Sequence, residues 1–183
     1  MSSRYKVYDD HTPHFITTTV VRWIDALSRP VYKDIIVDSL RFAISNKGLQ
    51  LHAWVIMNNH FHIIASAKEG VSLAEIIRDI KKFTSNQLLT EISVNPQESR
   101  REWMMKAFAY EGAHNNSNER FQFWQQGFHP VELSTEERFR QRLNYLHENP
   151  VRAGLVRQPQ DYVYSSAIDL YENKTGLLPL VDS

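Results

Sequence analysis

The hydrophobic and polar positions of the N-terminal third predict a strand followed by a helix. Residues 14–21 (HFITTTVV) are rich in β-branched side chains, which favours a strand. Residues 31–46 follow with apolar side chains at the spacing that makes one buried helical stripe: Ile35, Ile36, Leu40 and Ile44. Gly48 is a typical residue for the end of such a helix.

Two strands and a long helix are expected next. Residues 49–57 (LQLHAWVIM) and 60–67 (HFHIIASA) are strand-like and are separated by Asn58 and Asn59. Asparagine tolerates left-handed turn conformations, so we expect a hairpin. Residues 72–91 predict a helix that opens with a capping box of Ser72 and Glu75 and buries Leu73, Ile76, Ile77, Ile80 and Phe83.

The signals weaken from 94 to 118, where residues 114–118 (HNNSN) predict an exposed loop. Residues 121–125 and 128–133 predict short strands. A second capping box, Ser134 with Glu137, opens a helix that turns Phe139, Leu143 and Leu146 inward. This helix should end at Asn149, because proline disfavours a helical residue before it, and a short turn should end at Gly154.

The order of these elements predicts the fold class. Strand, helix, strand, strand, helix, strand and helix match an α+β, ferredoxin-like sandwich, with an antiparallel sheet and helices packed on one face. A length of 183 residues suits a single domain. We expect its core at about 12–167 and a C-terminal tail at 168–183.

Composition narrows the chemistry. Hydrophobic residues make up 42% of the chain and charged residues 23%, which is ordinary for a globular protein. The N-terminus lacks the apolar run of a secretory signal, and no stretch is apolar for long enough to span a bilayer, so we expect a cytoplasmic protein without a membrane partner. The cysteine count of 0 removes thiolate ligands and nucleophiles.

The formal net charge is +0, yet the charges are unevenly distributed. Residues 138–157 carry five arginines against the single Glu148, while the following segment is acidic. A local basic patch can bind phosphate even in a neutral protein. A solvated helix face is an equally good interpretation of this charge pattern.

Two histidines mark a candidate metal site. His60 and His62 are two residues apart on a predicted strand, so both imidazoles should lie on one face while Phe61 points to the other. An H-x-H pair alone more often reflects ordinary histidines. However, polar rings on an otherwise apolar strand need partners, and a cation is one such partner.

Tyr145 and Asn149 are neighbours on one helix face, because they are four residues apart. Asn149 lies at the expected helix end, where its carbonyl can reach outward. By themselves these two residues are also compatible with a half-buried aromatic beside a helix-terminating asparagine.

Residues 52–66 (HAWVIMNNHFHIIAS), 124–129 (WQQGFH) and 145–167 (YLHENPVRAGLVRQPQDYVYSSA) together resemble the single-tyrosine transposases of the HUH superfamily, especially the REP-associated tyrosine transposases. Separated motifs in the right order are more specific than any one of them alone. Relatives often carry a proline in the turn before H-x-H, where this chain has Asn58 and Asn59. The near-neutral charge is a second departure.

The resemblance implies a reaction and a set of residues. The metal pair falls on His60 and His62, the nucleophile on Tyr145 and the polar helix ligand on Asn149. The implied activity is cleavage and rejoining of single-stranded or hairpin DNA through a 5′-phosphotyrosine. Two imidazoles and one amide oxygen favour Mg²⁺ or Mn²⁺ without excluding zinc. Relatives act as dimers or as monomers, so a homodimer is among the expected partners.

Basic and aromatic side chains are candidates for DNA contacts. Phosphate contacts are expected from six residues: Arg78, Lys81, Lys82, Arg138, Arg142 and Arg152. Trp124 and Phe128 are candidates for stacking on unpaired bases, unless they belong to the core.

Three other functions compete with the transposase hypothesis. One is a protein of the same fold that binds a nucleic-acid hairpin without chemistry, and another is a hydrolase of small phosphate esters, in which the two histidines hold the ion and water attacks. A replication initiator or relaxase would share the tyrosine chemistry. The sequence of residues 145–167 favours a transposase, and this preference rests on the resemblance alone.

Overall fold

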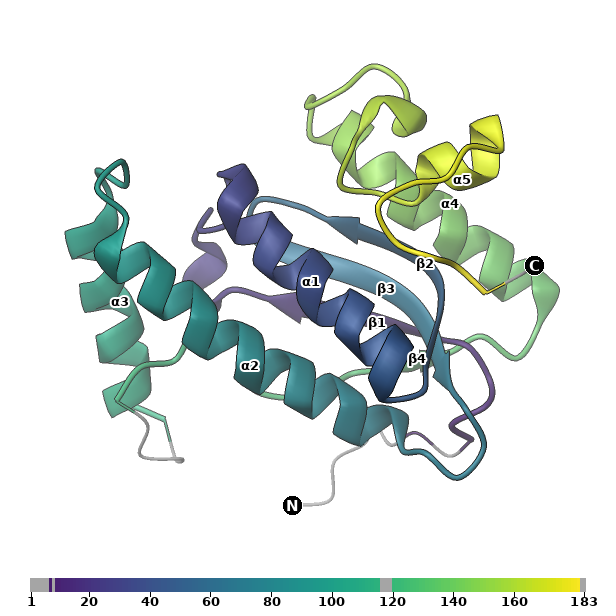
Figure 1. The fold of residues 1–183 in the computed structure, drawn as a ribbon, viewed down its shortest axis with the longest axis horizontal. Coiled ribbons are helices and arrows are strands. Elements are labelled where there is room, and N and C mark those ends of the chain that lie inside the picture. The colour runs from purple at the N-terminus through teal and green to yellow at the C-terminus, as the bar shows by residue number, and fades with distance from the viewer. Residues whose placement is uncertain (1–6, 8, 116–119, 182–183) are drawn as a thin grey trace.

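The computed structural model describes residues 7, 9–115 and 120–181 and centres on a four-stranded antiparallel sheet. The strands are β1 (His14–Thr19), β2 (Leu49–Ile56), β3 (His60–Ala67) and the short β4 (Val131–Glu132), in the spatial order β2-β3-β1-β4 (Figure 1). This is the strand order of a ferredoxin-like sheet, which confirms the predicted α+β class.

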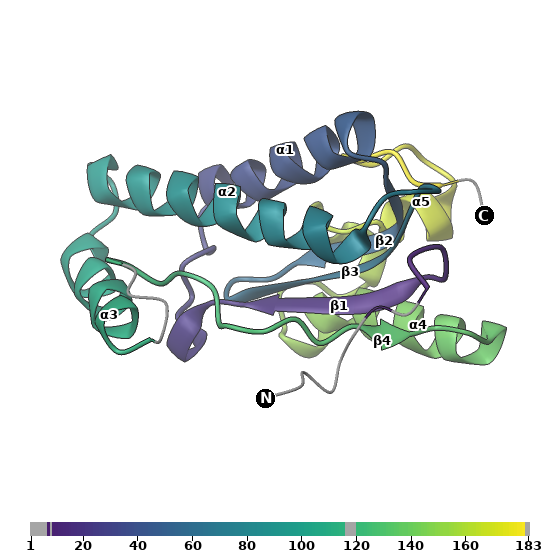
Figure 2. The same cartoon turned by 90° about the horizontal axis from the view of Figure 1, so that it is seen from below.

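Two helices cover one face of the sheet, as Figure 2 shows from the side. α1 (Pro30–Asn46) and α2 (Leu73–Val94) bury their apolar stripes there. They pack against the side chains that each strand turns toward them, among them Ile16, Trp54, Phe61 and Ile63. This layer is the main hydrophobic core.

The opposite face is covered by α4 (Glu136–Arg152), so the helices do not all pack on one face as expected. Leu146 of α4 is fully buried in a smaller apolar cluster with Phe15, Val55 and Ile64. These strand residues alternate with those of the main core. The period of two along each strand therefore gives the sheet two apolar faces, and a helix is needed on each.

Several predicted element bounds change in the structure. β1 ends at Thr19, and a short 3-10 helix, η1 (Val21–Trp23), follows. Of the expected strand at 121–125, a single bridge from Trp124 to Val20 is formed. A helix that sequence patterns did not indicate, α3 (Arg101–Ala113), lies between α2 and β4; its buried residues are Met104, Phe108 and Gly112. Residues 116–118 of the expected loop lie outside the described residues.

The helix caps and one buried position also differ. Ser72 caps α2 by accepting from the Glu75 backbone N–H, as expected. Thr135, and not Ser134, caps α4. Phe83 is 53% exposed, because Thr84 occupies the buried stripe of α2 in its place.

α4 continues through Pro150 to Arg152 instead of ending at Asn149. The backbone N–H of Ala153 donates to the carbonyl of Asn149, so the last turn keeps a hydrogen bond although proline has no N–H. Pro150 is buried, and this burial offsets the local preference to stop.

The C-terminal segment packs against the sheet. η2 (Pro159–Asp161) and α5 (Ala167–Glu172) follow α4, and Leu178 is 1% exposed in the main core. The backbone N–H of Val181 donates to Leu51. Among the described helices, none combines the length and apolar character that a membrane span requires.

Candidate functional site

Both histidines lie on the sheet face that α4 covers, beside the apolar cluster of that face. His60 and His62 project from β3 with ring centroids 4.7 Å apart, while Phe61 points into the main core. Thr17 of β1 is directly opposite His62, and its hydroxyl lies 2.8 Å from Nδ1 of that ring. The predicted one-sided placement of the two imidazoles is therefore what the structure has.

The contacts of the two rings engage Nδ1 of each, so Nε2 is the nitrogen that each ring has left for a ligand. Nδ1 of His60 lies 2.7 Å from the side-chain oxygen of Asn59, which can only accept, so Nδ1 carries the proton. Nδ1 of His62 is engaged by Thr17, whereas its Nε2 is buried without a hydrogen-bond partner. An unpartnered buried nitrogen is costly unless a ligand meets it.

Burial keeps both imidazoles neutral. Desolvation lowers the pKa of His62 to about 3, with smaller contributions from the charges of His60 and Arg142. Desolvation also lowers the pKa of His60, and a hydrogen bond with the Asn149 side chain partly opposes this. A neutral imidazole is the form that can bind a metal ion.

His60 is held in place by two supporting side chains, Asn59 and Asp25. The amide nitrogen of Asn59 donates to a carboxylate oxygen of Asp25 at 2.9 Å, which leaves its carbonyl oxygen to accept from His60. The Asp25, Asn59 and His60 side chains thus form a chain in which each hydrogen bond fixes the next group. Such outer partners orient ligand rings in metal sites.

α4 brings Tyr145 and Asn149 over the histidines. The ring of Tyr145 lies 5.6 Å from that of His62, and the side chain is 37% exposed. The amide nitrogen of Asn149 donates to the carbonyl of Tyr145, so its oxygen is the atom that meets His60. The four residues predicted from sequence meet in one place.

The fully buried His147 anchors α4 to the sheet. Its Nε2 lies 2.9 Å from the hydroxyl of Ser166, which also accepts from the backbone N–H of Trp54 in β2. This contact fixes the helix that carries Tyr145 relative to the strands that carry the histidines.

A cleft of about 440 Å³ opens over these residues and continues into a groove of about 880 Å³. The two hollows share Lys81, Gln125, Gln126 and Gly127. No carboxylate is among the described residues that line them, whereas five cationic side chains are: Arg78, Lys81, Lys82, Arg120 and Arg142. The neutral overall charge therefore conceals a basic surface that extends from the cleft along the adjoining groove.

The predicted basic residues divide into three groups. Arg142 and Arg152 are beside the site, with guanidinium groups 5.2 Å from the Phe15 ring and 5.5 Å from the Tyr145 ring. Arg78 and Lys82 line the adjoining groove, although Arg78 also pairs with nearby carboxylates. Arg138 is exposed at the start of α4 and lines neither hollow.

Lys81 has a structural role in addition to its position at the junction. Its ammonium group donates to the carbonyls of Gln125 and Gly127, both at 2.9 Å, and burial lowers its pKa. Lys81 therefore holds the loop that forms one wall of the cleft.

The aromatic candidates for base stacking belong to the core. Trp124 is 5% exposed and donates from its indole N–H to Thr84, and Phe128 packs against the main core. Tyr162 and Tyr164 are likewise occupied, because their hydroxyl groups donate to the Ile56 carbonyl and to Asp34.

Sequence patterns did not indicate several residues in or next to the site. Thr17 and Trp23 line the cleft, Arg120 lines the adjoining groove, and Asp25 and Asn59 support His60. Their placement depends on strand register and on how the segment after β1 folds back. The alternation of Thr17 with Ile16 along β1 was the available signal for the side of the sheet on which Thr17 lies.

The residues present fit a metal ion of mixed nitrogen and oxygen preference. Among the described residues, no group of three or more histidine or carboxylate side chains is placed to hold a metal. The His60 and His62 Nε2 atoms with the Asn149 oxygen are the donors that this site offers, and the unpartnered Nε2 of His62 is the observation in favour.

The sheet topology and the tyrosine helix over paired histidines define an α+β protein with a candidate metal site. The chain matches the family model described as "Transposase IS200 like" over residues 7–111, more than half of its length, and it belongs to this family. The match includes β3 and its histidines and ends before α4. No curated protein matches the chain.

Two solved structures are similar. One is a REP-associated tyrosine transposase bound to a REP hairpin, with a TM-score of 0.66 and 19% identity, covering 100% of this chain and 93% of that one. It establishes the fold. The other, a putative transposase from Deinococcus radiodurans R1, has a TM-score of 0.43 and 14% identity, with 80% and 97% covered.

Proposed function

We propose that this protein cuts and rejoins single-stranded DNA, with Tyr145 as nucleophile and a divalent cation held by His60, His62 and Asn149. The observation that carries the proposal is the unpartnered, buried Nε2 of His62 in the same cleft as an exposed tyrosine. Membership of the transposase family gives the reaction class, and the geometry suggests the residues.

The proposed step is a phosphoryl transfer from the 3′ oxygen of the DNA to the Tyr145 oxygen. The Tyr145 oxygen loses its proton and bonds to the scissile phosphorus, while the bond from phosphorus to the 3′ oxygen breaks and that oxygen takes up a proton. The products are a 5′-phosphotyrosine and a free 3′ hydroxyl. Because the new ester is similar in energy to the old one, a 3′ hydroxyl can reverse the step and join strands.

A bound Mg²⁺ or Mn²⁺ would withdraw charge from the scissile phosphate and stabilise the leaving oxygen. The protein's own residues orient the ligands and neutralise the phosphate charge. Asn59 and Thr17 hold the imidazoles in place, and Arg142 and Arg152 provide positive charge beside Tyr145 for the phosphate.

The substrate we propose is hairpin DNA with an unpaired flank. The similar structure is a protein bound to a hairpin, and the groove next to the cleft is basic and without carboxylates among its described residues. Such a groove suits a phosphate backbone.

The decisive experiment traps the adduct. End-labelled hairpin DNA with unpaired flanks is incubated with the protein and Mn²⁺, and an adduct stable to denaturation is mapped by mass spectrometry. We expect the nucleotide on the peptide with Tyr145. Tyr145→Phe should reduce adduct formation at least about a thousandfold, because only the nucleophilic oxygen is removed.

Tyr162→Phe and Tyr164→Phe are matched controls, since each also loses one tyrosine hydroxyl, but outside the cleft, and should keep the adduct. An adduct on another tyrosine would refute the assignment of Tyr145. DNA binding without an adduct would favour a hairpin-binding protein, and phosphate-ester hydrolysis that survives Tyr145→Phe would favour a hydrolase.

A further inference from the structure

Trp23 is a large aromatic side chain left exposed at the mouth of the cleft. Its side chain is 58% exposed, whereas Trp54 and Trp124 are buried. The indole meets His60 edge-on, with ring centroids 5.8 Å apart at 70°, so one ring contacts the site while much of the indole surface faces solvent.

The backbone at Trp23 is strained. Arg22 and Trp23 have φ values of 55° and 56°, two successive non-glycine residues in the left-handed region. This conformation is unfavourable for residues other than glycine, and bulky residues are uncommon there. Strain of this kind persists only where the surrounding structure imposes it.

The segment around Trp23 is fixed at both ends by hydrogen bonds. The N–H of Val21 donates to the carbonyl of Phe123, and that of Leu27 donates to the carbonyl of Asn58. Between them, the Asn59 amide donates to the Asp25 carboxylate at 2.9 Å and to the Trp23 carbonyl at 3.4 Å. The residue that orients His60 thus also holds Trp23.

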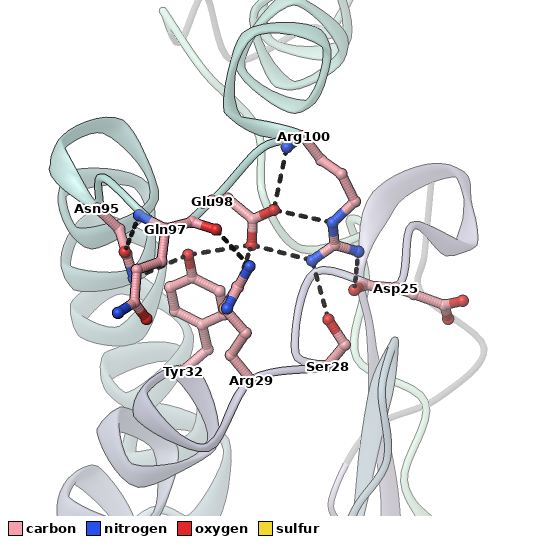
Figure 3. Close-up of polar contacts among 8 residues, drawn as sticks. All are labelled: Asp25, Ser28, Arg29, Tyr32, Asn95, Gln97, Glu98 and Arg100. Carbon is pink, nitrogen blue, oxygen red and sulfur yellow. Dashed lines mark hydrogen bonds and ion pairs between the residues drawn. The ribbon is translucent and has the colours of Figure 1, made fainter.

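A buried ionic cluster completes this support (Figure 3). Glu98, whose side chain is 0% exposed, receives hydrogen bonds from Arg29, Tyr32 and Arg100, and we call these four residues the Glu98 cluster. Arg100 also donates to the carbonyl of Asp25 and to the hydroxyl of Ser28. The cluster ties the turn between α2 and α3 to the segment that presents Trp23.

We propose that Trp23 is a stacking platform for an unpaired nucleobase next to the phosphate at His60 and His62. This inference rests on the proposed function. Each nucleotide carries a base beside its phosphate, so a strand whose phosphate meets the histidines brings a base to the adjacent indole. Stacking on an aromatic ring accepts any base and is a main source of affinity for single strands.

The basic walls of the cleft favour a nucleic acid as the occupant over an apolar peptide. Arg142 and Lys81 line the same cleft as Trp23, and no carboxylate is among its described lining residues. Positive charge for the backbone and one exposed ring for a base are the two components of a single-strand subsite.

The test separates base from phosphate. A DNA hairpin with unpaired thymidine tails is compared with the same hairpin carrying abasic tails, which keep every phosphate. Wild-type protein should bind the base-bearing tails about tenfold more tightly, the size expected for one stacked base. Trp23→Ala should bring this ratio close to one, and Trp23→Phe should retain part of it.

Trp103→Ala is the matched control, because Trp103 is 49% exposed on α3, outside the cleft, and the ratio should stay at its wild-type value. A thermal melt checks that each variant folds. A ratio unchanged in Trp23→Ala overturns the proposal. So does an equal loss of affinity for both tails, which would mean that the indole supports the site or the fold without touching a base.

Adduct formation at Tyr145 is measured separately with the same DNAs. A ratio that collapses in Trp23→Ala without any adduct supports the stacking subsite and refutes the proposed chemistry. An adduct with no difference between the two tails supports the chemistry and refutes the subsite. Absence of binding to either DNA refutes both.

Discussion

The Glu98 cluster and the His60–His62 pair are both buried polar groups, and they differ in whether their hydrogen-bonding capacity is used. Both carboxylate oxygens of Glu98 accept hydrogen bonds from arginines. The Nε2 of His62 has no partner. Satisfied buried networks rigidify a fold. Nδ1 of buried His147 is also unpartnered, but His147 lines neither hollow, whereas His62 lines the cleft, where a ligand can reach it.

The two regions also differ in the charge that they favour. Hydrogen bonds from Arg100, followed by weaker contributions from Arg29, lower the pKa of Glu98 to about 2 and so maintain its negative charge. Burial lowers the pKa of His62 to about 3 and so maintains a neutral ring with a free lone pair. The first region stabilises an ion, and the second keeps a ring in the neutral form that the proposed metal site requires.

Removing the carboxylate of Glu98 should have the largest effect on stability. Glu98→Ala should lower the free energy of unfolding by about 4 kcal/mol, because two arginines and a tyrosine lose their common acceptor. Urea unfolding measures the change. Glu102→Ala, which removes an exposed carboxylate nearby on α3, should change stability by less than about 0.5 kcal/mol. Equal effects from both would show that the cluster is not a structural anchor.

Replacing the unpartnered histidine should affect metal binding more than stability. His62→Phe keeps a ring of similar shape beside Phe15, so we expect a stability change within about 1 kcal/mol. Mn²⁺ affinity should fall at least about a hundredfold, since a ligand is lost. Calorimetric titration tests this, with His52→Phe on β2 as the control that retains affinity. Wild-type affinity in His62→Phe would remove His62 from the metal site.

Acid should affect the two regions in different pH windows. The unfolded imidazole takes up a proton below its ordinary pKa of 6.5, whereas folded His62 stays neutral down to about pH 3, so stability falls as pH drops through this interval. One such residue costs about 2 kcal/mol by pH 5. Buried His147, whose pKa is lowered to about 4, contributes similarly.

The contribution of Glu98 is present above its ordinary pKa of 4.5 and is lost as pH falls from 4.5 toward 2. Unfolding curves from pH 7 to pH 3 should therefore show a shallower decline between 6.5 and 4.5 in His62→Phe. In Glu98→Ala that interval should keep its wild-type slope. If the decline between pH 6.5 and 4.5 became shallower in Glu98→Ala and stayed at the wild-type slope in His62→Phe, the neutral state of His62 would be contradicted.

Because burial lowers both site histidine pKa values, metal binding should also persist below pH 6, lower than an ordinary histidine pKa would suggest.

The smallest expected effect is at the link between the two regions. Asn59→Ala should weaken Mn²⁺ binding about tenfold, because His60 loses the acceptor that fixes its Nδ1 proton. Nitrogen NMR of the metal-free protein should show a mixture of His60 tautomers. Combining Asn59→Asp with Asp25→Asn exchanges donor and acceptor and should restore one tautomer. If Asn59→Ala keeps the wild-type His60 signal and the double variant does not restore a single tautomer, Asn59 does not position His60.

Local periodicity predicted the parts of the site that a single element provides. The alternation along β3 placed His60 and His62 on one face, and the helical spacing in α4 placed Tyr145 beside Asn149. Thr17 and Asp25 meet these residues through strand register and chain return, which no local pattern encodes. The sequence rule for Pro150 failed because burial in the tertiary structure outweighed a local preference.

Helix α3 escaped prediction for a related reason. It buries few large apolar side chains, chiefly Met104 and Phe108, while Trp103 and Tyr110 on it are exposed. A helix with so weak an apolar stripe carries little periodic signal. Its position at the end of α2 depends on contacts with the rest of the fold, including the Glu98 cluster at its start.

The anchoring of α4 by His147, Ser166 and Trp54 has a kinetic consequence. Because this contact fixes the tyrosine helix over the histidine strand of the same chain, one polypeptide provides all four residues of the proposed site. At saturating DNA, adduct formation should then be a first-order process within one protein molecule. Its half-time should not lengthen when the enzyme is diluted.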